Sequence, residues 1–303
     1  MSKETISELF EVKPGKKVRL KDSEASRLEK KLFATSDKKE AKKEAELILE
    51  KDLSIMREAQ ELLYANNLHS ILIIFQAMDA AGKDSMISHV MSGLNPQGCQ
   101  VYSFKVPSNE ELEHNFLWRY MKALPERGRI GIFNRSHYEE VLVVKVHREL
   151  LERQRLPDGK SEKELWKERY EDINNLELHL SRNGTLVLKF FLHISRDEQK
   201  ERFIERLNNP SKNWKFSEAD VRERSFWEDY KKAYEEALSS TSTTWAPWHI
   251  IPSDHKWAAR TAVARIITEK IKSLKLRPPE VSEDTRIQLG KAKKLLIDES
   301  REK

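Results

Sequence analysis

Residues 69–86, "HSILIIFQAMDAAGKDSM", decide the fold of this chain. They open with a short apolar run of the kind that forms a strand buried on both faces. A tight turn of small residues follows, and apolar residues then recur on one helical face from Met86 to Leu94. A strand, a turn and a helix N-terminus in this order predict an anion site, because free backbone N–H groups and the positive end of the helix dipole face one point.

The turn has the composition of a phosphate-binding loop. Small side chains at Ala80, Ala81 and Gly82 let the backbone approach phosphate oxygens, and the Lys83 ammonium adds a mobile positive charge. We therefore predict that these residues bind phosphate together with the two that begin the helix, Asp84 and Ser85.

The turn also departs from the usual pattern G-x-x-x-x-G-K-[ST]. Ala77 replaces its first glycine, and Asp84 replaces the hydroxyl that normally holds Mg²⁺. Asp79 would supply the metal ligand instead, since Mg²⁺ binds through one or two carboxylates plus substrate phosphates, and Mn²⁺ is the expected substitute. The residues alone leave open an ordinary strand-to-helix turn.

The rest of the chain alternates strands with helices, which predicts an α/β fold with a mostly parallel five-stranded sheet covered on both faces. The expected strands are 69–75, 100–106, 129–135, 184–194 and 247–253. The expected helices are 83–92, 108–123, 136–147, 161–182, 195–208, 254–274 and 281–301.

One domain with an inserted lid explains this order best. Residues 1–64 form a charged helical extension packed on the core, 65–275 the core and 276–303 a C-terminal helix. The polar loops "NNPSKN" and "SSTSTT" bracket a lid of about residues 208–244. Lys189 interrupts the apolar run "LVLKFFL" of the fourth strand.

Composition excludes several classes of protein. The 303 residues include 55 basic and 50 acidic side chains, so the net charge of +5 is too small and too evenly mixed to indicate a nucleic-acid partner. Cys99 is the only cysteine, which indicates a reducing compartment. The start lacks the apolar core of a signal peptide, and the apolar runs are too short to span a bilayer. We expect a cytoplasmic protein with no membrane partner.

The stretch "GIFNRSHYEEVLVVKVH" carries a second motif. It begins as a strand and passes into a helix, and the end of a strand beside the phosphate loop is where a second catalytic group should project. Arg135 would direct its donors at a transferred phosphoryl group. The alternative is that Arg135 and Glu139 form an ion pair on a helix surface.

A third group of basic residues lies around the lid. Arg202 and Arg206 share one helical face beside a Pro/Asn-rich hinge. P-loop kinases use such arginines to neutralise the charge of the transferred group, although a solvated charged helix would have the same composition. The candidate set is Arg202, Arg206, Lys212, Lys215, Arg222 and Arg224.

Taken together, "DAAGKD", "GLNPQG", "FKVPS", "LWRY", "GIFNRSHYEEVLV" and "APWHIIPSDHKWAAR" resemble the polyphosphate kinase 2 family, especially its short one-domain class III members. The resemblance covers roughly residues 65–265, with the motifs in the family's order. It implies a three-layer α/β/α P-loop kinase fold similar to thymidylate kinase, with a helical lid. The departures in the phosphate loop are then features of the family.

The resemblance also implies an activity. A Mg²⁺-dependent kinase of this kind reversibly transfers the terminal phosphoryl group of inorganic polyphosphate to AMP and ADP. Adenine nucleotides are the expected acceptors, with guanine nucleotides as further acceptors, and the expected assembly is a homodimer or homotetramer. A row of Lys and Arg along the lid would follow the polyphosphate chain.

By the same resemblance, the catalytic residues are Asp79, Lys83, Asn134, Arg135 and Glu139. Asn134 stands where many relatives carry a metal-ordering aspartate, and it keeps an acceptor oxygen without the charge. Glu139 matches a glutamate associated with accepting AMP as well as ADP. The nucleotide pocket would be lined by Phe104, Lys105 and Arg119. Two rival hypotheses remain: an ATP-dependent nucleoside monophosphate kinase and a non-catalytic binder of polyphosphate or RNA.

Overall fold

The computed structural model describes residues 5–25, 28, 32, 33, 35, 37–157, 159–211, 213 and 217–299. Five strands form one sheet in the order β2-β3-β1-β4-β5, and every neighbouring pair is parallel. This confirms the predicted five-stranded sheet. The strands are β1 (Ser70–Ala77), β2 (Cys99–Ser103), β3 (Ile130–Asn134), β4 (Thr185–His193) and β5 (Trp248–Pro252).

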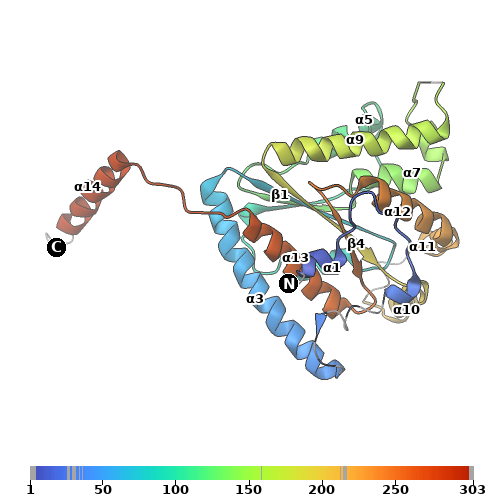
Figure 1. Ribbon diagram of the computed structural model, residues 1–303, viewed down its shortest axis with the longest axis horizontal. Coiled ribbons are helices and arrows are strands. Elements are labelled where there is room, and N and C mark those ends of the chain that lie inside the picture. The colour runs from blue at the N-terminus through green and yellow to red at the C-terminus, as the bar shows by residue number, and fades with distance from the viewer. Residues whose placement is uncertain are drawn as a thin grey trace.

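Helices cover both faces of the sheet (Figure 1), which gives the predicted three layers. One apolar core includes residues of α1 (Ile6–Phe10), α3 (Lys38–Asn66), α4 (Lys83–Val90) and α13 (Lys256–Ser273). The opposite core includes residues of η3 (His137–Val141), α7 (Val143–Val146), α9 (Glu162–Arg182) and α12 (Trp227–Thr241).

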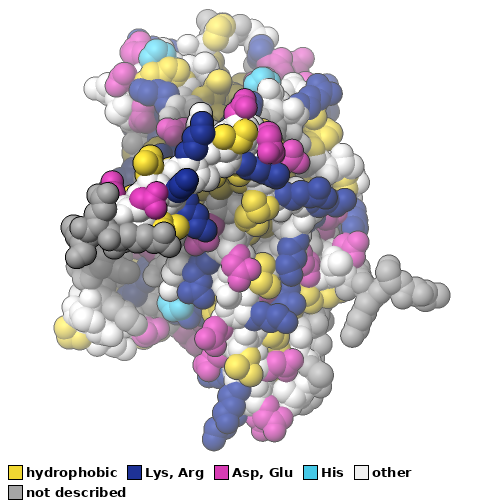
Figure 2. All heavy atoms as spheres, turned by 90° about the vertical axis from the view of Figure 1, so that its left-hand side faces the viewer, with side chains coloured by type: hydrophobic (Ala, Val, Ile, Leu, Met, Phe, Trp, Pro, Cys, Tyr) yellow, Lys and Arg dark blue, Asp and Glu magenta, His cyan; other side chains and the backbone are white. Residues whose placement is uncertain are grey.

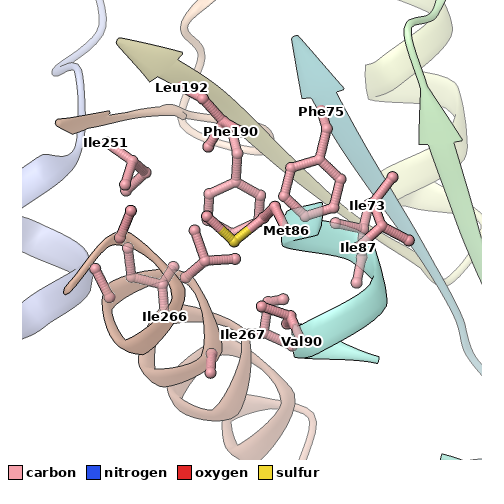
Figure 3. Close-up of a cluster of buried hydrophobic side chains, with 14 of the residues drawn as sticks. Ile73, Phe75, Met86, Ile87, Val90, Phe190, Leu192, Ile251, Ile266 and Ile267 are labelled. Atoms are coloured by element: carbon pink, nitrogen blue, oxygen red, sulfur yellow. The ribbon is translucent and has the colours of Figure 1, made fainter. Parts of the chain in front are cut away.

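The central strand β1 contributes side chains to both cores because successive side chains of a strand point to opposite faces. Ile73 and Phe75 belong to the first core, and Leu72 and Ile74 belong to the second. Figure 3 shows the middle of the first core, where Phe75 and its neighbours on the sheet face α4 and α13. The phosphate loop is therefore anchored on the most deeply buried strand of the molecule.

Two of the expected helices are broken into shorter pieces. The segment 108–123 forms α5 (Asn109–Leu112) and α6 (Trp118–Met121), because Ser108 caps the first helix and the Asn115 side chain accepts from the N–H of Leu117. The segment 136–147 begins as the 3₁₀ helix η3 and continues as α7 after Leu142, whose φ of −112° and ψ of −80° are not helical.

The C-terminal half of the predicted lid, residues 227–241, is the helix α12. α12 is packed against the rest of the fold: Ala233, Tyr234 and Leu238 are buried in the second core, and Trp227 is buried in the first. A lid at this place stays a proposal, and residues 209–226 are here called the lid segment; its described helices are α11 (Glu218–Glu223) and η5 (Arg224–Phe226). It follows α10 (Arg196–Asn208).

The two ends of the chain differ in their relation to this framework. The N–H of Val12 donates to the carbonyl of Trp248 at 2.8 Å, so the N-terminal segment covers part of the β5 edge. α14 (Glu283–Glu299) extends away from the rest of the chain (Figure 1). The remaining short helices are η1 (Asp22–Glu24), η2 (Pro96–Gly98) and α8 (Glu149–Glu152).

The surface mixes charges of both signs. Figure 2 shows basic and acidic side chains interspersed on one face, with apolar side chains scattered among them. Within the part of the chain that the structure describes, no helix combines the length and apolarity needed to cross a bilayer.

Candidate active site

The turn after β1 has the backbone of an anion-binding loop. Ala80 and Gly82 have φ values of +60° and +99°, in the left-handed region, and Gly82 is the N-cap of α4. Glycine suits position 82 because any other residue would be strained at this positive φ, although there is room for its Cβ atom. The first amides of α4 have no partner within the helix, so they are free to bind an anion.

This loop opens into a cleft of about 760 Å³ at the carboxyl ends of β1, β2 and β3, where α10 and α11 also approach. The cleft brings together twelve of the predicted site residues: Asp79, Ala80, Gly82, Lys83, Asp84, Ser85, Phe104, Lys105, Asn134, Arg135, Arg202 and Arg206. Ala81 is the exception within the loop, because its N–H donates to the carbonyl of Met78 at 3.3 Å.

Lys83 is a half-buried cation in the floor of this cleft. Its Nζ donates to the carbonyl of Ala77 at 3.0 Å. Burial lowers the pKa of Lys83, and the nearby Arg135 charge lowers it further, while the carboxylates of Asp79 and Glu139 oppose both effects. Two cations held this close together favour the binding of an anion between them.

Arg135 follows β3 in a left-handed conformation, with a φ of +64°. Its N–H donates to the carbonyl of Phe75 at 3.1 Å, which ties the residue to the phosphate-loop strand. Its guanidinium lies 3.3 Å from Asp79 Oδ1 and 3.6 Å from Glu139 Oε2. A strained non-glycine backbone of this kind is typical of functional sites, where surrounding contacts enforce it.

The Arg135–Glu139 ion pair exists, but it does not lie on an outer helix surface. Both residues border the cleft or the cavities beside it, and burial raises the pKa of Glu139. The Glu139 carboxylate in turn raises the pKa of Arg135. Glu139 therefore orients and stabilises the guanidinium that faces the cleft.

Asn134 and Asp84 form a pair that sequence reasoning missed. Asn134 Nδ2 donates to Asp84 Oδ1 at 2.7 Å, and Ser103 Oγ lies 3.4 Å away. An aspartate at position 134 would place two carboxylates against each other, whereas the amide donates to Asp84. Asn134 and Asp84 both depart from the usual kinase pattern, and this double departure is the sequence feature from which their pairing could have been predicted.

The cleft fits a divalent metal only together with substrate phosphates. Among the described residues there is no group of three or more His, Cys, Asp or Glu side chains arranged to hold a metal ion. Asp79 and Asp84 nevertheless flank Lys83 in the cleft wall. One or two carboxylates completed by phosphate oxygens and water are a usual Mg²⁺ environment.

The predicted lid arginines divide into two kinds. Arg202 is 5% exposed, and its guanidinium donates to the carbonyls of Ala80 and Ala81 at 3.0 and 2.9 Å. It also donates to the carbonyls of Ser253 and Asp254 at 2.7 and 3.0 Å and, through Nε, to Glu198 at 2.7 Å. All five N–H donors therefore have acceptors, so Arg202 holds the phosphate loop in place.

The other lid candidates have different places. Arg206 lines the cleft, with Asp220 at 4.0 Å. Arg224 donates to the carbonyl of Arg196 and to Gln199 Oε1 at 2.8 and 2.9 Å. Arg222 is exposed and lies outside the lining of the cleft. The two lysines, Lys212 and Lys215, lie outside the described residues.

Two further cavities adjoin the cleft at Val106 and Arg135. The larger, about 460 Å³, is walled by aromatic and acidic side chains, among them Trp227, Tyr230 and Tyr234. The smaller, about 100 Å³, is mostly apolar, and Glu139 lines both. An apolar and aromatic space next to a phosphate site suits the base and sugar of a nucleotide.

The predicted nucleotide residues lie at the edge of these cavities. Phe104 and Lys105 line both the cleft and the smaller cavity. Of the cleft and the two adjoining cavities, Arg119 lines only the smaller cavity, and it donates to the carbonyl of Lys105 at 2.8 Å and lies 3.5 Å from Glu140. It therefore supports the backbone of Lys105.

Sequence reasoning missed other residues of the cleft wall. Lys256 lies in the stretch "SDHKWAAR", which resembles the family but carries no residue pattern that predicts a role for this lysine. Asp220 gave no signal, because one carboxylate in a charged lid segment looks like an ordinary solvated residue.

Comparison with known proteins agrees with this geometry. The family model of polyphosphate kinase 2 matches residues 36–278. An ADP-polyphosphate phosphotransferase of Rhodopseudomonas palustris is 51% identical over 259 residues, which are 85% of this chain and 90% of that protein. An AMP/ADP-polyphosphate phosphotransferase of Meiothermus ruber is 44% identical over 242 residues, 80% of this chain and 85% of that protein.

A solved structure is similar over almost the whole chain. The crystal structure of polyphosphate kinase 2 from Arthrobacter aurescens TC1 superposes with a TM-score of 0.83 at 35% identity, covering 98% of this chain and 97% of that one. The shared fold therefore includes both the sheet and the helices that form the cleft.

Proposed function

This chain belongs to the polyphosphate kinase 2 family, and from that premise we propose that it transfers the terminal phosphoryl group of inorganic polyphosphate to AMP and ADP, giving ADP and ATP. The observation that carries the proposal is the convergence of three cationic or donor groups on one cleft. These are the amide-lined turn at Gly82, the ammonium of Lys83 and the guanidinium of Arg135.

Donor and acceptor take different parts of the site. Polyphosphate lies in the 760 Å³ cleft, whose lining includes Lys83, Lys105, Arg206 and Lys256. The nucleotide lies in the adjoining cavities, and its terminal phosphate points back to Arg135. Arg135 lines all three spaces, so it lies where the two substrates meet.

The transfer is an in-line displacement. An oxygen of the nucleotide's terminal phosphate forms a bond to the terminal phosphorus of polyphosphate. The bond from that phosphorus to its bridging oxygen breaks, and the shortened chain leaves with the electron pair. Lys83 and Arg135 stabilise the charge on the transferred group, so catalysis consists of positioning and electrostatics. A bound Mg²⁺ on Asp79 would neutralise further phosphate charge.

A strong general base is unnecessary because a nucleotide phosphate is already an anionic nucleophile. Glu139 therefore acts through Arg135, which it holds at 3.6 Å. The same chemistry runs in reverse when ATP is abundant, since polyphosphate and nucleotide phosphates carry similar phosphoanhydride bonds.

A donor survey tests the proposal. Purified protein receives AMP or ADP with either polyphosphate or ATP as the sole donor, and nucleotides are separated by chromatography. We expect ADP and ATP to form with polyphosphate. If ADP forms from AMP only when ATP is the donor, and never with polyphosphate, the protein is an ATP-dependent nucleoside monophosphate kinase instead. If polyphosphate binds but no donor gives turnover, the protein is a non-catalytic binder.

We further propose that Mg²⁺ is the cofactor, that Mn²⁺ can substitute for it, and that guanine nucleotides are secondary acceptors. We also propose that the protein acts in the cytoplasm as a homodimer or homotetramer. Burial raises the pKa of the lone Cys99 thiol to about 11, which suits an unreactive thiol in a reducing compartment. Light scattering tests the assembly, and a metal titration of the donor survey tests the cofactor.

A further inference from the structure

Lys189 is a fully buried charge in the middle of a central strand. It lies on β4 between Ile74 of β1 and Trp248 of β5 in the sheet register, and its exposed fraction is 0%. Its neighbours along the strand are apolar. A lysine in such a place is costly unless every donor has a partner, so its partners should explain its presence.

Each of the three ammonium protons has an acceptor. Lys189 Nζ lies 2.6 Å from Glu177 Oε2, 2.8 Å from Tyr138 Oη and 2.7 Å from the carbonyl of Thr241. The Tyr138 hydroxyl donates to the other Glu177 oxygen at 2.8 Å, and His137 Nε2 lies 3.5 Å from that oxygen. Lys189, Glu177 and Tyr138 are thus joined by hydrogen bonds in a polar network, here called the Lys189 network, inside a largely apolar core.

The Lys189 network ends directly beneath the candidate active site. Tyr138 lies on η3 between Arg135 and Glu139, the ion pair that faces the cleft. Tyr138 is 0% exposed, and its ring meets that of Trp248 edge-on at 4.6 Å. Tyr138 therefore links two parts of the fold. Its hydroxyl is bonded to Lys189 of β4 and Glu177 of α9, and its backbone belongs to the short segment that carries Arg135.

That segment needs such anchoring. Arg135 has a left-handed backbone, which persists only where surrounding contacts enforce it. Ser136 is buried and accepts from Gln76 Nε2 at 3.2 Å, which fixes the segment to β1. Tyr138 fixes it to β4, two residues further on. Together these contacts define the path of the chain on which Arg135 and Glu139 are mounted.

Stability alone does not account for the network. Replacing a buried ion pair by apolar side chains of similar volume is often neutral or stabilising, because the charges must be desolvated. A strand of the sequence "LVLKFFL" would bury an apolar residue at position 189 at no such cost. The remaining role that the contacts support is a specific orientation of the segment 135–139.

We propose that Lys189, Glu177 and Tyr138 are positioning residues that aim Arg135 and Glu139 into the cleft. The inference rests on the proposed role of Arg135 in phosphoryl transfer. The three residues touch neither donor nor acceptor, so their loss lowers the rate of transfer and leaves the binding of both substrates intact.

Tyr138→Phe is the decisive variant. It removes one hydroxyl, keeps the ring on Trp248 and leaves Lys189 paired with Glu177. We expect kcat to fall at least about tenfold, because a small misplacement of a catalytic group is costly, while KM for polyphosphate and for nucleotide changes less than about twofold. A kcat equal to that of the wild type would overturn the inference.

Tyr170→Phe is the matched control. Tyr170 is also a buried tyrosine of the second core, and its hydroxyl accepts from Lys145 Nζ at 3.3 Å, a hydrogen bond that does not involve the segment 135–139. Its variant should keep the wild-type kcat. Equal losses of kcat in both variants would show a general effect of buried hydroxyls and would contradict the inference.

The double variant Lys189→Met, Glu177→Leu separates positioning from stability. It removes both charges and keeps apolar volume, but it leaves the Tyr138 hydroxyl and the Thr241 carbonyl without these partners. The protein should therefore stay folded, with at most a modest loss of melting temperature, while kcat falls with KM unchanged. A folded double variant with the full kcat would contradict the proposal. Arg135→Ala in the same assay tests the premise. If Arg135→Ala lowers kcat strongly and Tyr138→Phe keeps the wild-type kcat, this inference alone is rejected. If Arg135→Ala keeps the wild-type kcat, the assigned role of Arg135 is rejected.

Discussion

Arg202 and Arg206 lie one helical turn apart on α10, yet they belong to different regions of the cleft. Arg202 is 5% exposed, and its five N–H donors hold backbone carbonyls and Glu198. Arg206 has a 24% exposed side chain that lines the cleft, and its ion-pair partner is 4.0 Å away. In the floor of the cleft an arginine shapes the site, whereas on the lid side we propose that an arginine binds an anion.

This difference has a simple physical origin. A guanidinium that is surrounded by carbonyls has no donor left for phosphate, and it fixes the peptide orientations of the loop it touches. A guanidinium beside a distant carboxylate keeps its donors for a ligand. The two kinds of arginine should therefore respond differently to mutation and to salt.

The largest effect is expected at the junction of the two substrates. Arg135→Ala should lower kcat about 1,000-fold, since an arginine on the transferred phosphoryl group is worth that order of rate. Arg135→Lys should recover only part of the loss, because an ammonium lacks the planar fork. Steady-state kinetics with polyphosphate and ADP provides the measurement, and a variant within threefold of wild type would remove Arg135 from the mechanism.

A slightly smaller effect is expected in the phosphate loop. Lys83→Met should lower kcat by roughly 100-fold to 1,000-fold, the range seen when one preorganised donor is lost from a transition-state site. Polyphosphate affinity, measured by calorimetry, should fall much less, because the loop amides and the other cations remain. A variant that binds normally and turns over normally would show that the loop is only a strand-to-helix turn.

The comparison itself is tested by substituting the two α10 arginines. Arg202→Lys should lower kcat about tenfold or more through a misplaced loop, with an unchanged salt dependence of KM for polyphosphate. Arg206→Gln should leave kcat nearly intact, raise that KM, and flatten its dependence on ionic strength, because one screened contact is lost. If both variants altered the salt dependence equally, the division between floor and lid side would be wrong.

The smallest effect concerns stability, far from the cleft. Burial lowers the pKa of His249 from 6.5 to about 3, and its Nε2 lies 3.0 Å from Ser7 Oγ. Between these pKa values the unfolded chain binds a proton that the folded chain refuses, so stability falls as the pH drops below 6.5. From pH 6.5 to pH 5 the wild type should lose about 2 kcal/mol more than His249→Gln. Urea unfolding at both pH values measures this, and parallel losses would contradict it.

Local sequence patterns were enough to predict the sheet and the position of the phosphate loop. A two-sided apolar run such as that before Asp79 has few structural alternatives, and strand, turn and helix are neighbours in the chain. Trp227 also lies in the first core, as its size and apolarity would suggest. These features depend on interactions within a few residues, which sequence periodicity records.

The remaining features depend on contacts between distant segments. The spacing of Arg202 and Arg206 indicates one helical face, but it does not reveal that the carbonyls of Ala80 and Ala81 lie above one of them. In the same way, Asn134 and Asp84 are 50 residues apart, and only the sheet brings them within 2.7 Å. The polar composition of residues 208–244 likewise concealed that α12 packs into the core.

A crystal structure with pyrophosphate tests the central claim most directly. The account predicts one phosphate group that accepts from the amide of Gly82 and contacts both Lys83 Nζ and the Arg135 guanidinium, with Arg202 still bonded to the loop carbonyls. Pyrophosphate bound elsewhere, with these three groups facing different directions, would contradict the account.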